Sequence, residues 1–146
     1  MTAPESRPVI VVGVDGSEVS KEALQWAAKQ AQLSGAELRA VIAWRSPTTY
    51  GWAPDYGGFD FAADARMTLE EAVTETLGAP PSVPVTISVI EGHPAPVLND
   101  ASRSADLLVV GSHGHSAFTG MLLGSVSQHC VQHATCPVLV YRPRTP

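Results

Sequence analysis

The chain has 146 residues, of which 45% are hydrophobic and 16% are charged, and its formal net charge is −5. These values are typical of one soluble globular domain spanning residues 1–146, and they argue against a general nucleic-acid-binding protein, which would carry a basic stripe. The sequence shows neither a signal peptide nor an apolar run of roughly 18–20 residues that could cross a membrane, so we expect a cytoplasmic location.

The first part of the chain predicts a β-α-β unit. An apolar, β-branched run predicts a buried strand over Val9–Val14. Ser17 fits the N-cap of a helix over Glu18–Ser34, and Gly35 fits the left-handed position at which such a helix ends. A second strand is predicted over Glu37–Trp44.

The segment 45–60 is rich in proline, glycine and aromatic residues and has no periodicity. It is longer than an ordinary connection between a strand and a helix. Two interpretations stay open: a mobile cover over a ligand site, or an insert that packs or is disordered.

The rest of the chain alternates again between helical and strand patterns. The predicted elements are a helix over Phe61–Leu77, a half-exposed edge strand over Val83–Ile90, a short helix over Pro94–Ser104, a strand over Leu107–Val110, a helix over Ser125–Ala134 and a last strand over Val138–Tyr141. Five strands alternating with four helices predict an α/β fold, a doubly wound parallel sheet with helices on both faces.

The stretch Asp106–Ser127 suggests phosphate binding. Its apolar strand ends at Gly111, and Gly114 and the pair Gly124-Ser125 follow. Glycines let the backbone turn with positive φ and approach a ligand closely, and a helix N-terminus offers unpaired N–H groups with about half a positive charge. Ordinary turns are the alternative interpretation.

The same stretch argues against phosphoryl-transfer chemistry. It lacks the lysine of the P-loop pattern GxxxxGK[ST], and it lacks the GxGxxG dinucleotide pattern. Without a cationic side chain, little would stabilise the charge that builds up during phosphoryl transfer. We therefore expect binding, with ATP hydrolysis at most slow, and catalysis stays an open question.

Asp15 follows the first strand and is a candidate ligand contact. If the first and fourth strands are neighbours, Asp15 faces the glycine loop across a crevice. A carboxylate beside phosphates would bind Mg²⁺, a sugar hydroxyl or an adenine amine. The alternative is an aspartate that stabilises a turn and caps a helix.

Three separated motifs resemble the universal stress protein family. They are the spacing Gly111-x2-Gly114-x9-Gly124-Ser125, the opening VVGVDGSEVS and the closing CPVLVYRP, and the likeness runs from Val9 to Pro143. The resemblance implies a sheet in the order 3-2-1-4-5, dimerisation through the fifth strand, and membership of the ATP-binding branch.

The resemblance also implies roles for individual residues. Gly13 and Asp15 would lie at the ribose or adenine, the backbone of Trp44 at the adenine edge, Val110, Gly111 and Gly114 beside the ribose and phosphates, and Gly124, Ser125, Val126 and Ser127 on the phosphates. Trp44 departs from the small apolar residue expected there, so its ring could stack on the base or obstruct it.

The last strand predicts an assembly. Its residues, Val138, Leu139, Val140 and Tyr141, have no polar alternation. At a sheet edge such a strand would leave backbone groups unpaired. We expect a two-fold homodimer through it, with coverage by the chain's own tail as the alternative.

Several other residues have side chains that are suited to binding or catalysis. His113 and His115 flank Gly114 and could contact phosphate or face solvent. His129 and His133 lie one helical turn apart, which suits a metal pair or a plain helix surface. Cys130 and Cys136 predict reduced thiols rather than a disulfide framework. Ser125 lacks the Gly-x-Ser-x-Gly elbow of a hydrolase, and the aromatic residues of the segment 45–60 lack the basic neighbours of a single-strand binder.

With these features, the resemblance implies a protein that binds ATP with Mg²⁺ and has a regulatory or signalling role in stress response. Two other classes stay open: a slow ATP hydrolase or adenylyl-transferring enzyme, and a nucleotide-free dimeric interaction protein. Cyclic AMP is a further possible ligand, because an uncharged cradle could accept one phosphate as readily as three.

Overall fold

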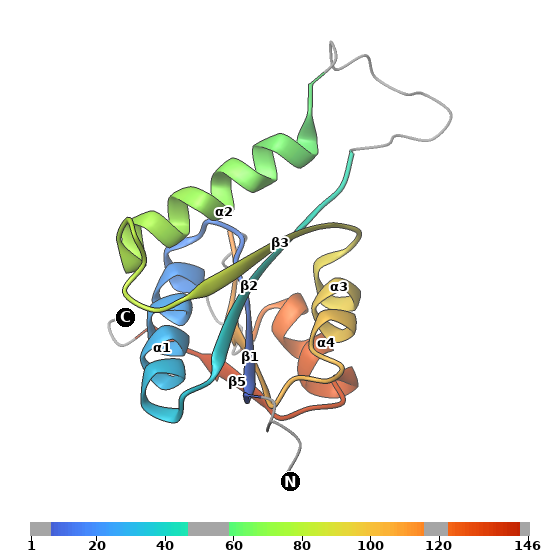
Figure 1. The fold of residues 1–146 in the computed structure, drawn as a ribbon. Coiled ribbons are helices and arrows are strands. Elements are labelled where there is room, and N and C mark those ends of the chain that lie inside the picture. The colour runs from blue at the N-terminus through green and yellow to red at the C-terminus, as the bar shows by residue number, and fades with distance from the viewer. Residues whose placement is uncertain (1–6, 47–58, 116–122, 144–146) are drawn as a thin grey trace, which may run out of the picture.

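The computed structural model describes residues 7–46, 59–115 and 123–143. In these residues five parallel strands form one sheet in the order β3-β2-β1-β4-β5 (Figure 1). The elements in chain order are β1 (Val9–Gly13), α1 (Glu18–Ser34), β2 (Glu37–Trp44), α2 (Phe61–Leu77), β3 (Val85–Glu91), α3 (Pro94–Ala101), β4 (Leu107–Gly111), α4 (Ser125–His133) and β5 (Val138–Tyr141). The predicted fold class and strand order are confirmed.

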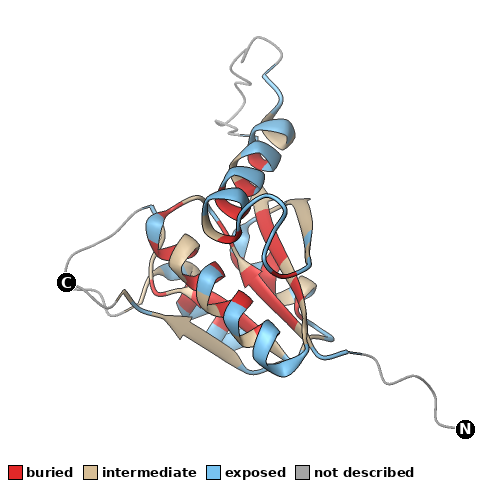
Figure 2. Ribbon diagram, turned by 60° about the vertical axis from the view of Figure 1, so that its left-hand side comes forward, coloured by how far each residue is buried: buried red, intermediate tan, exposed pale blue. Residues whose placement is uncertain are grey.

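Helices cover both faces of the sheet. Helices α1 and α2 pack on one face, where Leu24 and Leu69 meet alternate sheet residues such as Val12. Helices α3 and α4 pack on the other, where Leu98 and Cys130 join a second cluster. The centre of the sheet is therefore buried on both sides, as the red strands of Figure 2 show.

The helix starts follow local hydrogen bonding. Ser17 Oγ accepts from Ser20 N at 3.3 Å and caps α1, and Asp60 Oδ1 accepts from Ala63 N at 3.0 Å and caps α2. Helix α1 ends as predicted at Gly35, whose φ is 73°. The N-cap residues of α3 and α4 make no side-chain capping bond. One of these uncapped ends, that of α4, matters for the site below.

Several element ends differ from the sequence prediction by a few residues. Strand β3 begins at Val85 rather than residue 83, since Pro84 has no N–H to give to a ladder. Helix α3 stops at Ala101, because the chain turns there and Arg103 N bonds to Asp100 O at 3.2 Å. Helix α4 ends at His133, where the next residue is already extended. The order of the elements is unaffected.

Both edge strands are partly exposed. Side chains of β3 alternate as predicted, with Val85, Ile87 and Val89 packed against the core. All four residues of β5 are half-buried (tan in Figure 2). Within the described residues, no helix has the length and apolarity required to cross a bilayer. Of the segment 45–60, for which a cover and an insert were both possible, residues 47–58 lie outside the described residues.

Candidate functional site

The site lies at the carboxyl ends of β1 and β4. These strands are neighbours, but the chain leaves β1 towards β2 and leaves β4 towards β5. Such a switch in strand order opens a crevice in doubly wound sheets. Here it forms a cavity of about 310 Å³, within the range of roughly 300–1,000 Å³ that is usual for small-molecule sites.

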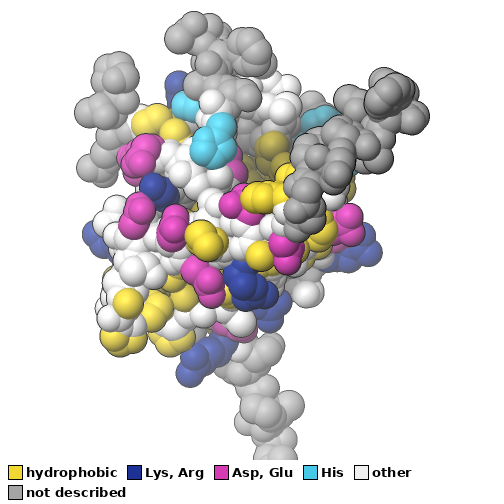
Figure 3. All heavy atoms as spheres, turned by 90° about the horizontal axis from the view of Figure 1, so that it is seen from above, with side chains coloured by type: hydrophobic (Ala, Val, Ile, Leu, Met, Phe, Trp, Pro, Cys, Tyr) yellow, Lys and Arg dark blue, Asp and Glu magenta, His cyan; other side chains and the backbone are white. Residues whose placement is uncertain are grey.

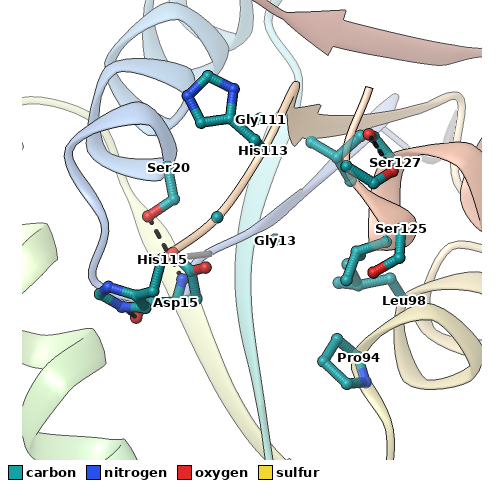
Figure 4. Close-up of a pocket in the computed structure, with 14 residues that line it drawn as sticks. Gly13, Asp15, Ser20, Pro94, Leu98, Gly111, His113, His115, Ser125 and Ser127 are labelled. Carbon is teal, nitrogen blue, oxygen red and sulfur yellow. Dashed lines mark hydrogen bonds between the residues drawn. The ribbon is translucent and has the colours of Figure 1, made fainter. Parts of the chain in front are cut away.

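The cavity collects the predicted site residues except Trp44. It is lined by Gly13, Asp15, Ser20, Pro94, Leu98, Val110, Gly111, His113, Gly114, His115, Gly124, Ser125, Val126 and Ser127. In Figure 4, Asp15, Ser20 and His115 lie on one side, and Pro94, Leu98, Ser125 and Ser127 lie on the other. Residues far apart in the sequence thus line the same cavity.

The glycines of the cavity are required by close packing. A Cβ at Gly114 would lie 2.5 Å from Asp15 Oδ2, and one at Gly124 would lie 3.1 Å from His113 Cα. A Cβ at Gly111 would lie 2.8 Å from Val19 Cγ1 of α1. Positive φ occurs at other described glycines, and these three are not among them. The expectation that they turn the chain through positive φ was therefore wrong; what matters is the missing side chain.

Asp15 stabilises the turn into α1 and has one carboxylate oxygen beside the glycine loop. Its Oδ1 accepts hydrogen bonds from Ser17 N at 2.9 Å and from Ser17 Oγ at 2.5 Å, which stabilises the turn into α1. Its main-chain N–H bonds to Ser20 Oγ at 3.3 Å. The other carboxylate oxygen, Oδ2, faces Gly114. One oxygen thus holds the turn, and the second lies beside the glycine loop.

His115 connects the loop that follows β4 to the loop between β1 and α1. His115 Nε2 lies 2.6 Å from Asp15 O, so a proton on this nitrogen is donated across the cavity mouth to the β1–α1 loop. His113 Nδ1 lies 3.0 Å from Ser112 Oγ, so that ring is bonded to its own loop. Histidine and acidic side chains appear on the same face in Figure 3. The hydrogen bonds of His113 and His115 position the described part of the loop after β4.

The start of α4 is bonded tightly to the end of β4. Gly124 N donates to Ser112 O at 2.6 Å. Ser127 Oγ donates to Ser112 O and to Gly124 O, each at 3.0 Å, and its side chain is buried. The Ser127 hydroxyl is therefore engaged within the protein, whereas Ser125 is exposed. The first N–H groups of α4 have no partner within the helix.

The described helix N-termini beside the cavity differ in what they offer an anion. The start of α1 is capped by Ser17, with the Asp15 carboxylate next to it. The start of α3 has Pro94, which lacks an N–H. The start of α4 has neither a side-chain cap nor an acidic residue in its first turn. An anion would therefore bind best at α4.

The charge around the cavity is sparse. Among the described residues that line it, Asp15 is the acidic one and no lysine or arginine is present. The described residues also contain no group of three or more side chains that could hold a metal ion by themselves. An anion would therefore be bound by main-chain N–H groups and by neutral hydroxyl and imidazole side chains.

Sequence reasoning missed three lining residues, and one of its predicted site residues lies outside the cavity. The position of Leu98 at the cavity follows from the packing of α3 and not from any motif in the sequence. Ser20 and Pro94 do not belong to any sequence motif that predicts a ligand contact. Trp44 lies outside this cavity: its side chain packs against the core on the α1 and α2 side, and its carbonyl accepts from Gly92 N at 2.8 Å.

Known proteins resemble this chain over nearly its whole length. The universal stress protein family matches residues 7–142. A universal stress protein of Mycobacterium tuberculosis is 42% identical over 142 residues, which cover 95% of this chain and 46% of that protein. One from Mycolicibacterium smegmatis is 38% identical over 144 residues, covering 97% and 48%. The chain thus spans about half the length of the curated relatives it matches.

Solved structures agree on the fold. UspA from Lactobacillus plantarum superimposes with a TM-score of 0.77 at 24% identity, covering 94% of this chain and 100% of that one. A universal stress protein in complex with cAMP superimposes with a TM-score of 0.68 at 28% identity, covering 94% and 98%.

Proposed function

This chain belongs to the universal stress protein family, and we propose that it binds an adenine nucleotide in the cavity between β1 and β4. The observation that carries the proposal is the uncapped N-terminus of α4 at a cavity whose wall requires Gly114. The phosphates lie at the start of α4, on the main-chain N–H groups of Ser125, Val126 and Ser127. The 28%-identical neighbour in complex with cAMP supports this assignment.

The rest of the cavity suits the nucleoside. Leu98, Pro94 and Val110 provide an apolar wall, and Asp15 and Ser20 provide polar atoms. The ribose and adenine therefore lie towards α3 and the β1–α1 loop, with Gly13 and Gly111 beneath them. The main chain of Trp44 stays a proposed adenine contact that would require a ligand reaching beyond this cavity.

We propose ATP as the nucleotide and Mg²⁺ as its counterion. One carboxylate, phosphate oxygens and waters are a normal set of ligands for Mg²⁺, and the free Oδ2 of Asp15 fits that set. When bound, the ion would neutralise phosphate charge beside this carboxylate. The donor set suits a ligand-borne Mg²⁺ rather than an ion held by the protein alone.

We propose that the output is regulatory rather than catalytic. No lysine or arginine lines the described cavity, so little is present to stabilise a phosphoryl-transfer transition state. Nucleotide occupancy would instead order the surrounding loops of a cytoplasmic homodimer that pairs through β5. A slow hydrolase would produce ADP over many turnovers, which a time course with excess ATP would detect.

The proposal is tested by titration calorimetry with ATP, AMP and cyclic AMP. Gly114→Ala places a methyl group against the Asp15 carboxylate, which Ser17 holds in place, so we expect nucleotide affinity to fall roughly tenfold or more. Gly35→Ala is the matched control, because a Cβ there meets nothing within 4 Å and only its backbone is strained. Equal affinity of Gly114→Ala and wild type would contradict the site.

A higher affinity for cyclic AMP than for ATP would favour the cyclic-nucleotide alternative, to which the cAMP-bound neighbour points. No binding of any of the three nucleotides by the folded wild type would favour the nucleotide-free interaction protein.

A further inference from the structure

Helix α4 carries two histidines on one exposed face. His129 and His133 are four residues apart, and both are exposed. Their ring centroids lie 5.8 Å apart with an angle of 31° between the ring planes. Two histidines at this spacing on one helical face are the pattern that holds Zn²⁺ in HExxH metalloproteases.

These two rings differ from the other described histidines. His93 contacts Arg45, His113 contacts Ser112 and His115 contacts Asp15. Within the described residues, neither His129 nor His133 has a hydrogen bond or an ion pair; each has only its ring contact with the other. Their nitrogens are therefore available to an external ligand without breaking an existing contact.

The separation of the rings fits a shared metal ion. Imidazole nitrogens bind Zn²⁺ at roughly 2.0–2.1 Å, which puts each ring centre roughly 3 Å from the metal. Two such distances meeting at a bent N–metal–N angle give a centroid separation of roughly 5 Å, slightly less than the observed 5.8 Å. Small side-chain rotations at an exposed surface would bring one nitrogen of each ring to the ion.

We propose that His129 and His133 form a surface chelate for a divalent transition-metal ion of the Cu²⁺, Ni²⁺ and Zn²⁺ class. The site is separate from the nucleotide cavity and does not depend on it. His133 lies in the last turn of α4, where the helix carries partial negative charge that favours a cation. The chain's net charge of −5 acts in the same direction.

The two imidazole ligands determine which metal ions bind and how strongly they bind. Imidazole suits Cu²⁺, Ni²⁺ and Zn²⁺, and Cu²⁺ binds most strongly in the usual order, whereas Mg²⁺ requires oxygen ligands. Because the described residues provide two side chains and not a closed set of four, waters complete the coordination. The ion is therefore exchangeable and is not required for folding.

The test is a Ni²⁺ titration of the full chain without a histidine tag, in the presence of excess Mg²⁺ and with the accessible thiol of Cys136 alkylated. We expect one Ni²⁺ per chain, unaffected by Mg²⁺, and a rise in Tm on saturation. His129→Gln and His133→Gln should each weaken binding roughly tenfold or more, because one ring then binds without the effective concentration provided by the second.

A matched control keeps the composition and changes only the spacing. In the double variant Val131→His with His133→Val, the two histidines are two residues apart and face different sides of α4, and Val131 is already 51% exposed. This variant should bind as weakly as the single glutamine variants. The proposal is overturned if it retains wild-type affinity, or if both glutamine variants, shown to be folded by circular dichroism, do so.

Discussion

At the scale of single residues, burial separates the two cysteines. Cys130 is fully buried in the cluster between the sheet and helices α3 and α4, whereas Cys136 is half-buried. Burial, with a smaller contribution from Cys136, raises the pKa of the Cys130 thiol from 9.0 to about 11. The reactive thiolate is therefore disfavoured at Cys130.

This difference predicts selective alkylation. At about pH 8, iodoacetamide should modify Cys136 in the folded protein and leave Cys130 intact, because alkylation requires an accessible thiolate. Peptide mass spectrometry would measure both sites, with urea-unfolded protein as the control in which both react. Faster modification of Cys130 than of Cys136 would contradict its burial.

The same pKa has a consequence for stability. Because the folded pKa of Cys130 lies above the unfolded value of 9.0, its contribution to the free energy of unfolding is complete below pH 9 and is lost as the pH rises through about 11. Urea unfolding across this pH range should show that the free energy of unfolding decreases. In Cys130→Ala this decrease between pH 9 and about 11 should be smaller.

At the scale of elements, α4 depends on one buried hydroxyl. Ser127 Oγ joins the first turn of α4 to Ser112 O at the end of β4. The Ser112 carbonyl also accepts from Gly124 N, so it keeps one partner when the hydroxyl is removed. The start of α4 is therefore positioned by hydrogen bonds to β4 as well as by its apolar side.

Ser127→Ala should lower the free energy of unfolding by about 1 kcal/mol, the usual contribution of one hydrogen bond. It should also weaken nucleotide binding, since the N–H groups of α4 would be held less firmly. Urea unfolding measures the first effect and calorimetry the second. Ser125→Ala, at an exposed position of the same turn, is the stability control and should leave unfolding unchanged.

At the scale of the whole molecule, β5 is an edge strand next to the site, and no described strand pairs with its outer side. Pro137 O and Tyr141 O accept hydrogen bonds from Leu108 N and Ser112 N of the β4 side. Because backbone groups alternate along a strand, those of Val138 and Val140 point to the free edge. A second copy pairing there would cover this edge, which supports the proposed homodimer.

Val140→Pro should therefore prevent dimerisation while leaving the β4 ladder intact, since it removes an N–H from the free side. Sedimentation velocity should show a monomer that remains folded by circular dichroism. Val89→Pro makes the same change at the opposite edge of the sheet. Gly92 N bonds to Trp44 O of β2, so the backbone groups of Val89, three residues earlier, point away from β2, and this variant should remain dimeric. A dimeric Val140→Pro variant would rule out pairing through β5.

The sequence by itself determined the elements and their order. Apolar β-branched runs and helical periodicity are local signals, and Ser17 and Gly35 mark helix ends through contacts within a few residues. The glycine spacing likewise predicts Gly114 and Gly124 as residues of the candidate site without any knowledge of the residues that pack around them. Element ends such as those of β3 and α3 were less predictable, because they depend on individual backbone hydrogen bonds.

Only the tertiary structure decided how the cavity is built. Asp15 and His115 meet across 100 positions of the chain, and Leu98 reaches the cavity because α3 packs over β1. It also showed that Gly114 leaves space for the Asp15 carboxylate and that the Ser127 hydroxyl is already bonded. These facts depend on distances between separate elements, and no local pattern encodes such distances.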